Sequence, residues 1–169
     1  METTYTSKNM IHNTRKKKCH ETPPRQKRYN EKRSINHMLN IIRTNFSAGD
    51  IGLHIIYGNA NSLNSEKRLK EDIRNYLLRI KRMYNKIGIQ PKYVYMKDYC
   101  KNGQAHIYII LSGGIDRDML IQIWGIPDSV VEPLQYENDD TIIQITKHIS
   151  KQKNQNRFGT SRNLHSSIV

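Results

Sequence analysis

The sequence predicts an α+β domain whose elements follow the order β-α-β-β-α-β, with one more helix at the end. Four short apolar or β-branched stretches indicate strands, and longer segments with apolar residues at helical spacing lie between them. An Asn-Gly pair at residues 102–103 separates two of these strands, residues 91–99 and 104–112, and is typical of a hairpin turn. This order is that of the split β-α-β, or ferredoxin-like, arrangement.

The first half of this domain begins with a short helix, which we predict over residues 34–46 with Ser34 as its N-cap. Residues 50–57, "DIGLHIIY", are predicted to be a buried strand because they are apolar and β-branched. Residues 65–88 form the clearest helix, since their apolar residues make one stripe that ends at Gly88.

The second half contains two further helices and the last strand. Asp116 is the predicted cap of a helix in which Trp124 is a core residue. Residues 128–136 form the fourth strand, and Pro133 places it at a sheet edge because proline cannot donate to a strand ladder. Residues 138–152 are predicted to be the final helix, with acids in the first turn and lysines in the last.

The domain therefore spans residues 34–165, between a basic arm at residues 1–33 and a tail at residues 166–169. Beyond residue 152 the chain is polar and is predicted to contain no further strand or helix. Helices are expected to cover one face of the sheet and to leave the other face free for nucleic acid, as in RNA-recognition modules.

Net charge is the strongest functional signal. The 169 residues carry a net charge of +13 with a pI near 9.8, which is typical of a protein that binds a polyanion. Residues 15–33 hold nine Lys or Arg against two Glu, so the arm is expected to be unstructured alone and to contact phosphate. The cations that we predict to bind nucleic acid are Arg15, Lys16, Lys17, Lys18, Arg25, Lys27, Arg28, Lys32, Arg33, Lys147, Lys151, Lys153, Arg157 and Arg162.

Several function classes are disfavoured. No run of eighteen or more apolar residues predicts a membrane span, and no apolar segment resembles a secretory signal, so a cytoplasmic protein is expected. Cys19 and Cys100 lack the C-x-x-C spacing of zinc sites. The glycines at residues 113–114 lack the lysine of a phosphate-binding loop. No cofactor is predicted.

The strand "GQAHIYIIL" carries the most informative polar residues. His106 and Tyr108 stand two places apart in an otherwise apolar stretch, so their side chains share one face of the sheet. Two histidines at this spacing would offer a pair of metal ligands, and this chain has one.

Five stretches together resemble a known family. "NFSAGDIGLHIIY", "KYVYMKDYCKNGQAHIYIIL", "GIDRDMLIQIWG", "ITKHISK" and "TSRNL" are similar, in order and spacing, to the rolling-circle replication initiators of phages and plasmids, the HUH endonucleases, in the phage gene-II-like branch. The resemblance covers roughly residues 30–165. It implies the ferredoxin-like fold and a domain that nicks single-stranded DNA through a metal and a tyrosine nucleophile.

The resemblance also implies that this nicking site is degenerate. In the family an acid and a His-hydrophobe-His triplet bind the metal. Asp98 or a neighbour matches the acid, and His106 matches the first histidine. Tyr108 stands in place of the second histidine, and it is a poor ligand because its phenol has a pKa of about 10. His148, followed three places later by Lys151, stands where the family has its tyrosine nucleophile. No functional metal site is therefore expected, and Asp98 and His106 are vestigial candidates.

These observations leave several hypotheses open. The first is a nucleic-acid-binding protein of a mobile element, with single-stranded DNA or structured RNA as partner. The second is a nuclease, either a metal-free ribonuclease that uses His106, Tyr108, His148 and Lys151 as acid, base and phosphate clamp, or a nickase that uses Tyr99 or Tyr136. The third is an inhibitor of a host defence ribonucleoprotein, such as an anti-CRISPR protein that grips the guide RNA. We favour the first.

Overall fold

A computed structural model describes residues 22–57, 65–100, 104–151 and 158–165, with backbone alone for residues 65 and 149–151. The elements, in chain order, are α1 (Pro24–Asn45), β1 (Ile51–Tyr57), α2 (Ser65–Lys86), β2 (Tyr93–Tyr99), β3 (Ala105–Leu111), α3 (Arg117–Trp124), β4 (Val130–Pro133), α4 (Asp139–Lys151) and β5 (Phe158–Thr160). The protein is therefore of the α+β class, as predicted.

The strands form one five-stranded antiparallel sheet in the order β4-β1-β3-β2-β5. β3 lies between β1 and β2, with Ile107 opposite Ile55 on one side and opposite Lys97 on the other. β4 lies at one edge of the sheet, which confirms the position predicted from Pro133.

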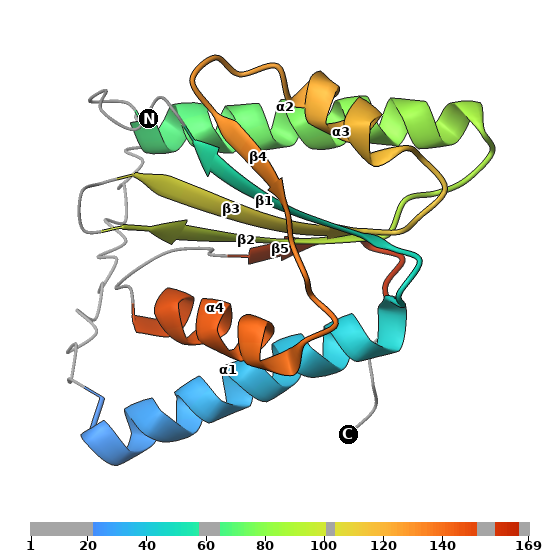
Figure 1. The fold of residues 1–169 in the computed structure, drawn as a ribbon. Helices are drawn as coiled ribbons and strands as arrows, with labels where there is room; N and C mark the ends of the chain where they lie inside the picture. The colour runs from blue at the N-terminus through green and yellow to red at the C-terminus, as the bar shows by residue number, and fades with distance from the viewer. Residues whose placement is uncertain (1–21, 58–64, 101–103, 152–157, 166–169) are drawn as a thin grey trace, which may run out of the picture.

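Helices cover both faces of this sheet. α2 and α3 lie on one face and α1 and α4 on the other (Figure 1). The expectation of a free face for nucleic acid is therefore wrong. The reason is α1, whose residues Ile35, Met38, Leu39 and Ile42 bury a second apolar stripe against the sheet.

Two cores result from the alternation of side chains along the strands. Leu53, Ile55 and Ile107 pack toward α2 and α3, whereas Val94 and Ile110 pack toward α1 and α4. All five are fully buried, and each burial contributes roughly 1.5–3 kcal/mol to folding. The histidines at residues 54 and 106 alternate with the first group, so they belong to the α1 and α4 side.

The first helix begins ten residues earlier than predicted, at Pro24 instead of after Ser34. Pro24 occupies the first helical turn, where its fixed φ suits a helix and its missing N–H costs nothing, and Pro23 is the N-cap. The Arg, Gln, Lys and Glu side chains that follow are good helix formers. Ser34 is thus an interior helical residue, and the predicted boundary at residue 33 falls inside α1.

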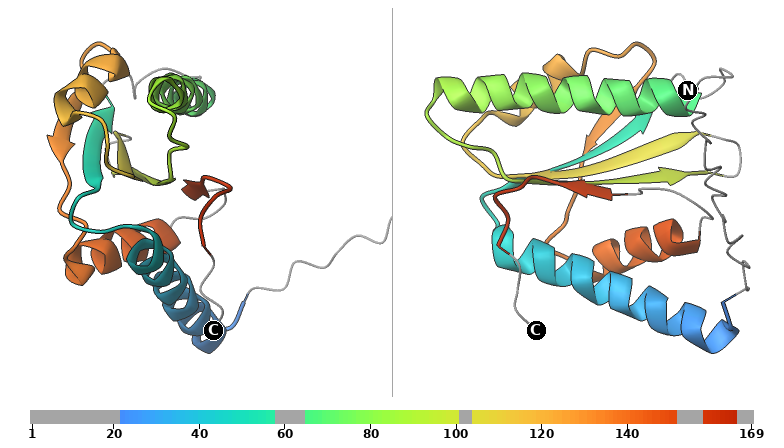
Figure 2. Two further views of the ribbon diagram at one scale, coloured as in Figure 1. Left: turned by 90° about the vertical axis from the view of Figure 1, so that its right-hand side faces the viewer. Right: turned by 180° about the vertical axis from the view of Figure 1, so that it is seen from behind.

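A fifth strand was not predicted. Phe158–Thr160 pairs with β2 along the edge of the sheet opposite β4, in a segment expected to lack regular structure (Figure 2). Gly159 permits this close pairing, because a Cβ there would lie 2.4 Å from the ring of Tyr95. Three residues are too few for a periodic pattern, so the strand depends on its partner.

In the part of the chain that the structure describes, no helix has the length and apolar character needed to cross a membrane.

Candidate functional sites: a histidine cluster and a basic groove

Three aromatic side chains form a histidine cluster on the α1 and α4 side of the sheet. His54 on β1 stacks on Tyr108 of β3, with ring centroids 4.7 Å apart, and on His106, at 5.1 Å. The strand register explains this geometry, because His54 lies directly opposite Tyr108 and one step diagonally from His106.

A line of polar contacts runs through this cluster across the sheet. His54 Nε2 lies 2.9 Å from His106 Nδ1, and His106 Nε2 lies 3.2 Å from Cys100 Sγ. At the other end, His54 Nδ1 lies 3.3 Å from a carboxylate oxygen of Glu132 on β4. An ionised Glu132 can only accept a hydrogen bond, so Nδ1 of His54 is assigned as the nitrogen that carries the proton. Nε2 of His54 then accepts a hydrogen bond from the N–H at Nδ1 of His106.

Burial sets the protonation of two members of the cluster. Desolvation, followed by the charge of His106, lowers the pKa of His54 below 6.5, while Glu132 opposes this shift. Desolvation, followed by the charges of Asp98 and Cys100, raises the pKa of Tyr108 to about 12. Tyr108 is therefore a neutral phenol at physiological pH and not an anionic ligand.

His54 is expected to make the protein less stable in mild acid. Its folded-state pKa is below the unfolded value, so the stability it contributes is present above about pH 6.5 and is lost as the pH falls through the folded value. His54→Phe keeps a ring against Tyr108 and removes the titration. Its free energy of unfolding should change less than that of the wild type between about pH 7.5 and about pH 5.5.

The matched control for this measurement is His37→Phe, which replaces an exposed histidine of α1. It should keep the pH dependence of the wild type. An identical pH dependence for the wild type and His54→Phe would contradict the assignment of a partly buried, neutral imidazole at residue 54.

The structure places Asp98, His106 and Tyr108 on the side of the sheet that α4, with His148, also covers. Asp98 lies opposite His106 in the strand register, and its carboxylate is 3.9 Å from Nδ1 of His148 on α4. His148 itself is largely exposed. Lys151 ends α4, and its side chain lies outside the described residues. Tyr136, one of the alternative nucleophiles, is buried and donates its hydroxyl to the Ser47 carbonyl.

The donor set does not fit a divalent metal. Both ring nitrogens of His106 contact other side chains, and Tyr108 retains its proton. Among the described residues, no group of three or more His, Cys, Asp or Glu side chains could hold a metal ion.

Sequence reasoning missed His54, Glu132 and Cys100. His54 had a detectable signal, because it interrupts an apolar strand at a position that alternates with buried residues, as His106 does. Glu132 and Cys100 had no detectable signal in the sequence, since only strand pairing brings β4 and the end of β2 to the same cluster.

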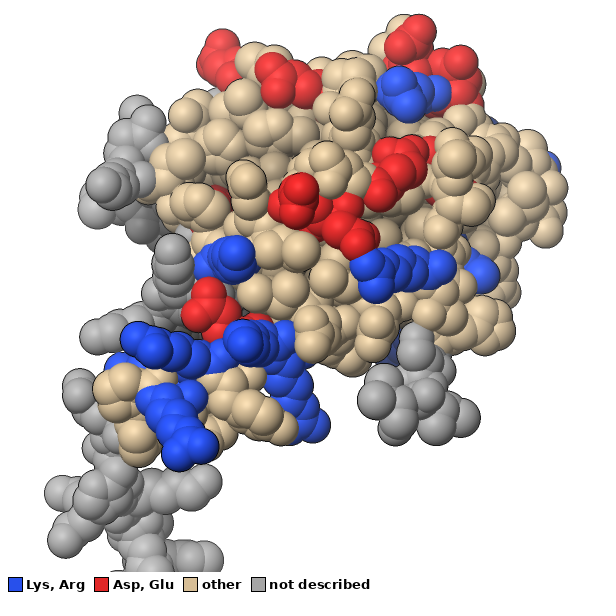
Figure 3. Space-filling model, turned by 60° about the horizontal axis from the view of Figure 1, so that its bottom comes forward, with Lys and Arg blue, Asp and Glu red and all other residues tan. Residues whose placement is uncertain are grey.

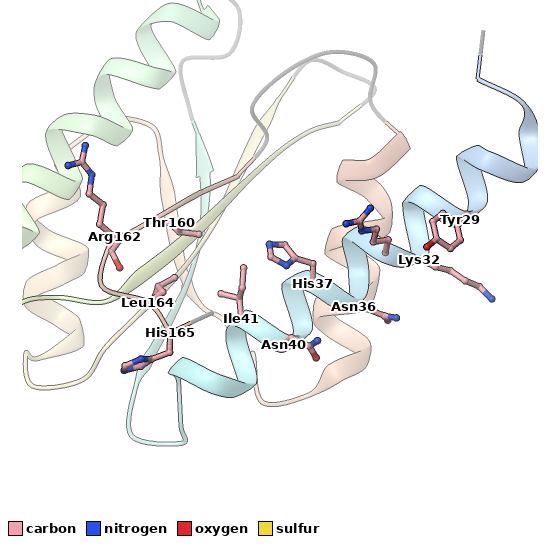
Figure 4. Close-up of a pocket in the computed structure, with 12 residues that line it drawn as sticks. Tyr29, Lys32, Asn36, His37, Asn40, Ile41, Thr160, Arg162, Leu164 and His165 are labelled. Atoms are coloured by element: carbon pink, nitrogen blue, oxygen red, sulfur yellow. The ribbon is translucent and has the colours of Figure 1, made fainter. Parts of the chain in front are cut away.

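The second candidate site is a groove between α1 and the segment that follows β5, which we call the α1 groove. It has a volume of about 1160 Å³. One wall is a face of α1 that carries Lys32, Arg33, Asn36, His37 and Asn40, and the other carries Ser161, Arg162 and His165. In Figure 4, His37 and Ile41 point from α1 toward Thr160 and Leu164, while Arg162 is directed away from the helix. No carboxylate is among the described residues that line it.

Hydrogen bonds hold the two walls of the α1 groove together. The side-chain amide of Asn45 donates to the His165 carbonyl over 2.9 Å, and the amide oxygen of Asn45 accepts from the His165 backbone N–H over 2.7 Å. Ser161 exchanges two further bonds with the backbone of Tyr93 on β2. The groove is thus built by tertiary contacts and not by one element.

Predicted cations concentrate beside this groove. Arg25, Lys27, Arg28, Lys32 and Arg33 all lie on α1, and Figure 3 shows Lys and Arg gathered over its first half. Lys147 is exposed on α4. Arg15, Lys16, Lys17, Lys18, Lys153 and Arg157 lie outside the described residues.

In comparisons with known proteins, no family model, no curated protein and no solved structure matches this chain. Its class is therefore defined by the fold alone: an α+β protein with a five-stranded antiparallel sheet and helices on both faces.

Proposed function

We propose that this protein binds nucleic acid and that the α1 groove is the interface. The observation that carries this proposal is a groove lined by Lys32, Arg33 and two histidines, with no carboxylate among its described lining residues. Cations that track a groove neutralise phosphates, and the amides of Asn36 and Asn40 supply donors and acceptors for sugars or base edges. A net charge of +13 adds long-range attraction for a polyanion.

We further propose that the protein is a cytoplasmic protein of a mobile element that derives from a rolling-circle replication initiator and has lost nicking. The order β4-β1-β3-β2 supports a ferredoxin-like origin. The convergence of Asp98, His106 and His148 on one side of the sheet supports descent from an initiator site. Tyr108 and His148 stand where the resemblance to initiators would place a metal ligand and the nucleophile, and this supports the loss of DNA cleavage.

One observation favours a second candidate function, metal-free cleavage of RNA. The contact between His54 and His106 gives one imidazole a defined proton-bearing nitrogen, as general acid–base chemistry requires. The 2′-hydroxyl of RNA would then be the nucleophile and the products would carry a 2′,3′-cyclic phosphate. His106→Ala is expected to lower such a cleavage rate by about 10²–10⁴-fold.

One experiment tests both proposals. Labelled single-stranded DNA, duplex DNA and structured RNA are incubated with the protein at several salt concentrations, with and without Mn²⁺. We expect the logarithm of the affinity to fall linearly with the logarithm of the salt concentration, and every substrate to stay intact. Absence of binding at low salt would contradict the interface, and cleavage of RNA that resists EDTA and requires His106 would favour the second candidate.

A further inference from the structure

A second groove lies on the opposite side of β5, between α2 and the β2 edge of the sheet, and we call it the α2 groove. It has a volume of about 500 Å³, within the range of about 300–1,000 Å³ that is typical of small-ligand sites. Lys70, Arg74 and Lys81 of α2 and Lys97 of β2 line it, and no carboxylate is among its described lining residues.

Lys97 is the unusual member of this set. It faces the α2 side of the sheet and is only 4 % exposed, although it lines the groove. Within the described residues, no hydrogen bond or ion pair engages its ammonium group. Burial, followed by the charge of Lys70, lowers the pKa of Lys97. The charge of Glu66, whose carboxylate pairs with Lys70 over 2.9 Å, opposes this shift. A buried cation costs free energy unless anions compensate it, and the groove gives a further anion access to Lys97.

The rest of the groove offers a surface for a flat ring. The Tyr93 and Tyr95 side chains and the apolar residue Leu77 lie beside the cations. The backbone of Gly159 packs so closely on the Tyr95 ring that a Cβ there would lie 2.4 Å from it, so the ring is held in place. Aromatic side chains stack on nucleic-acid bases, and lysines and arginines bind phosphate.

We propose that the α2 groove is a binding site for a nucleotide, with its phosphate on Lys97, Lys70 and Arg74 and its base against the tyrosine rings. The ligand has two sources with the same chemistry: a free mononucleotide, or the phosphorylated end of a strand held in the α1 groove. The second source rests on the proposed function. Thr160 of β5 lines both grooves, so the two grooves adjoin at this edge of the sheet.

Lys97→Met tests the site, because methionine has a similar shape and no charge. Calorimetry with adenosine monophosphate is expected to show binding to the wild type and a loss of affinity of about tenfold or more in the variant, since hydrogen bonds to a charged group contribute more than neutral ones. The free energy of unfolding, measured in urea, should stay the same or rise, because the variant no longer buries an unpartnered charge. A purely structural lysine would instead lower stability and leave nucleotide affinity unchanged.

The matched control is Lys86→Met, which removes the same charge from an exposed position of α2 outside the groove. It should bind the nucleotide as the wild type does. Arg74→Gln, at an exposed position within the groove, supplies a second test should Lys97→Met fold poorly, and it should also weaken binding.

Two oligonucleotides identify the source of the ligand. The ligand is a strand end if a 5′-phosphorylated strand binds more tightly than its 5′-hydroxyl counterpart and Lys97→Met loses this difference. Equal binding of the two strands, together with binding of the mononucleotide, indicates a free nucleotide. The proposal is overturned if neither the mononucleotide nor the 5′-phosphate is recognised, or if Lys97→Met recognises them as the wild type does. Variants of the α1 groove should retain mononucleotide binding, so failure of the proposed function is separable from failure of this site.

Discussion

Reversing the charges of Lys32 and Arg33 together to glutamate is expected to weaken nucleic-acid binding by about 10²-fold at about 0.1 M salt. Both residues line the α1 groove and are exposed on α1, so the fold should persist. Each phosphate contact that is lost removes about 0.7–0.9 from the slope of log affinity against log salt, so two contacts should flatten it by roughly 1.4–1.8. Fluorescence anisotropy of a labelled oligonucleotide across a salt series measures both quantities.

The control carries the same change of charge at a different place. Arg82→Glu with Lys86→Glu reverses two exposed cations of α2 that line neither groove. Its affinity should fall far less, because only the long-range field is reduced. Equal losses in the two double variants would show that net charge alone matters and that the α1 groove is not the interface.

Gly52→Ala is expected to destabilise the protein by about 3 kcal/mol, the upper part of the range for overpacked sites. A Cβ at residue 52 would lie 2.1 Å from the Leu134 carbonyl oxygen and 2.9 Å from the Tyr136 ring. That carbonyl belongs to backbone, which cannot move aside as a flexible side chain does. The Leu134 N–H also donates to the Gly52 carbonyl over 3.0 Å, so the substitution strains the connection from β4 to α4. Urea denaturation monitored by circular dichroism measures the loss.

Gly49→Ala is the matched control for this substitution. A Cβ at residue 49 would meet nothing within 4 Å, and the residue is exposed. Its effect should therefore stay within about 0.5 kcal/mol, as for other surface changes. A similar stability for the two variants would contradict the close approach of Leu134 to β1.

Elements with strong local signals could be predicted from the sequence. The Asp116 side chain caps α3 as predicted, since it accepts from the N–H groups of Asp118 and Met119. Trp124 is buried, and Gly88 adopts a positive φ just after α2. Each of these features depends on residues that are close in the chain, so a single sequence contains the information.

Elements that depend on distant partners could not be predicted in this way. β5 is too short for a periodic pattern and exists because β2 offers an unpaired edge. Part of the predicted site is found together in the structure, because Asp98, His106 and His148 lie on one side of the sheet. Its contacts were not predicted, because His54 meets His106 and Glu132 only through the pairing of β1 with β3 and β4.

By itself, then, the sequence determined the α+β class, the central strands and α2, and a charge suited to a polyanion, because these follow from local periodicity, turn residues and composition. That helices cover both faces of the sheet is visible only in the tertiary structure, because the apolar stripe of α1 is buried by residues of the second sheet face, which are distant in the chain. The tertiary structure also decided where the cations lie, because both grooves form only where a helix passes the β5 edge.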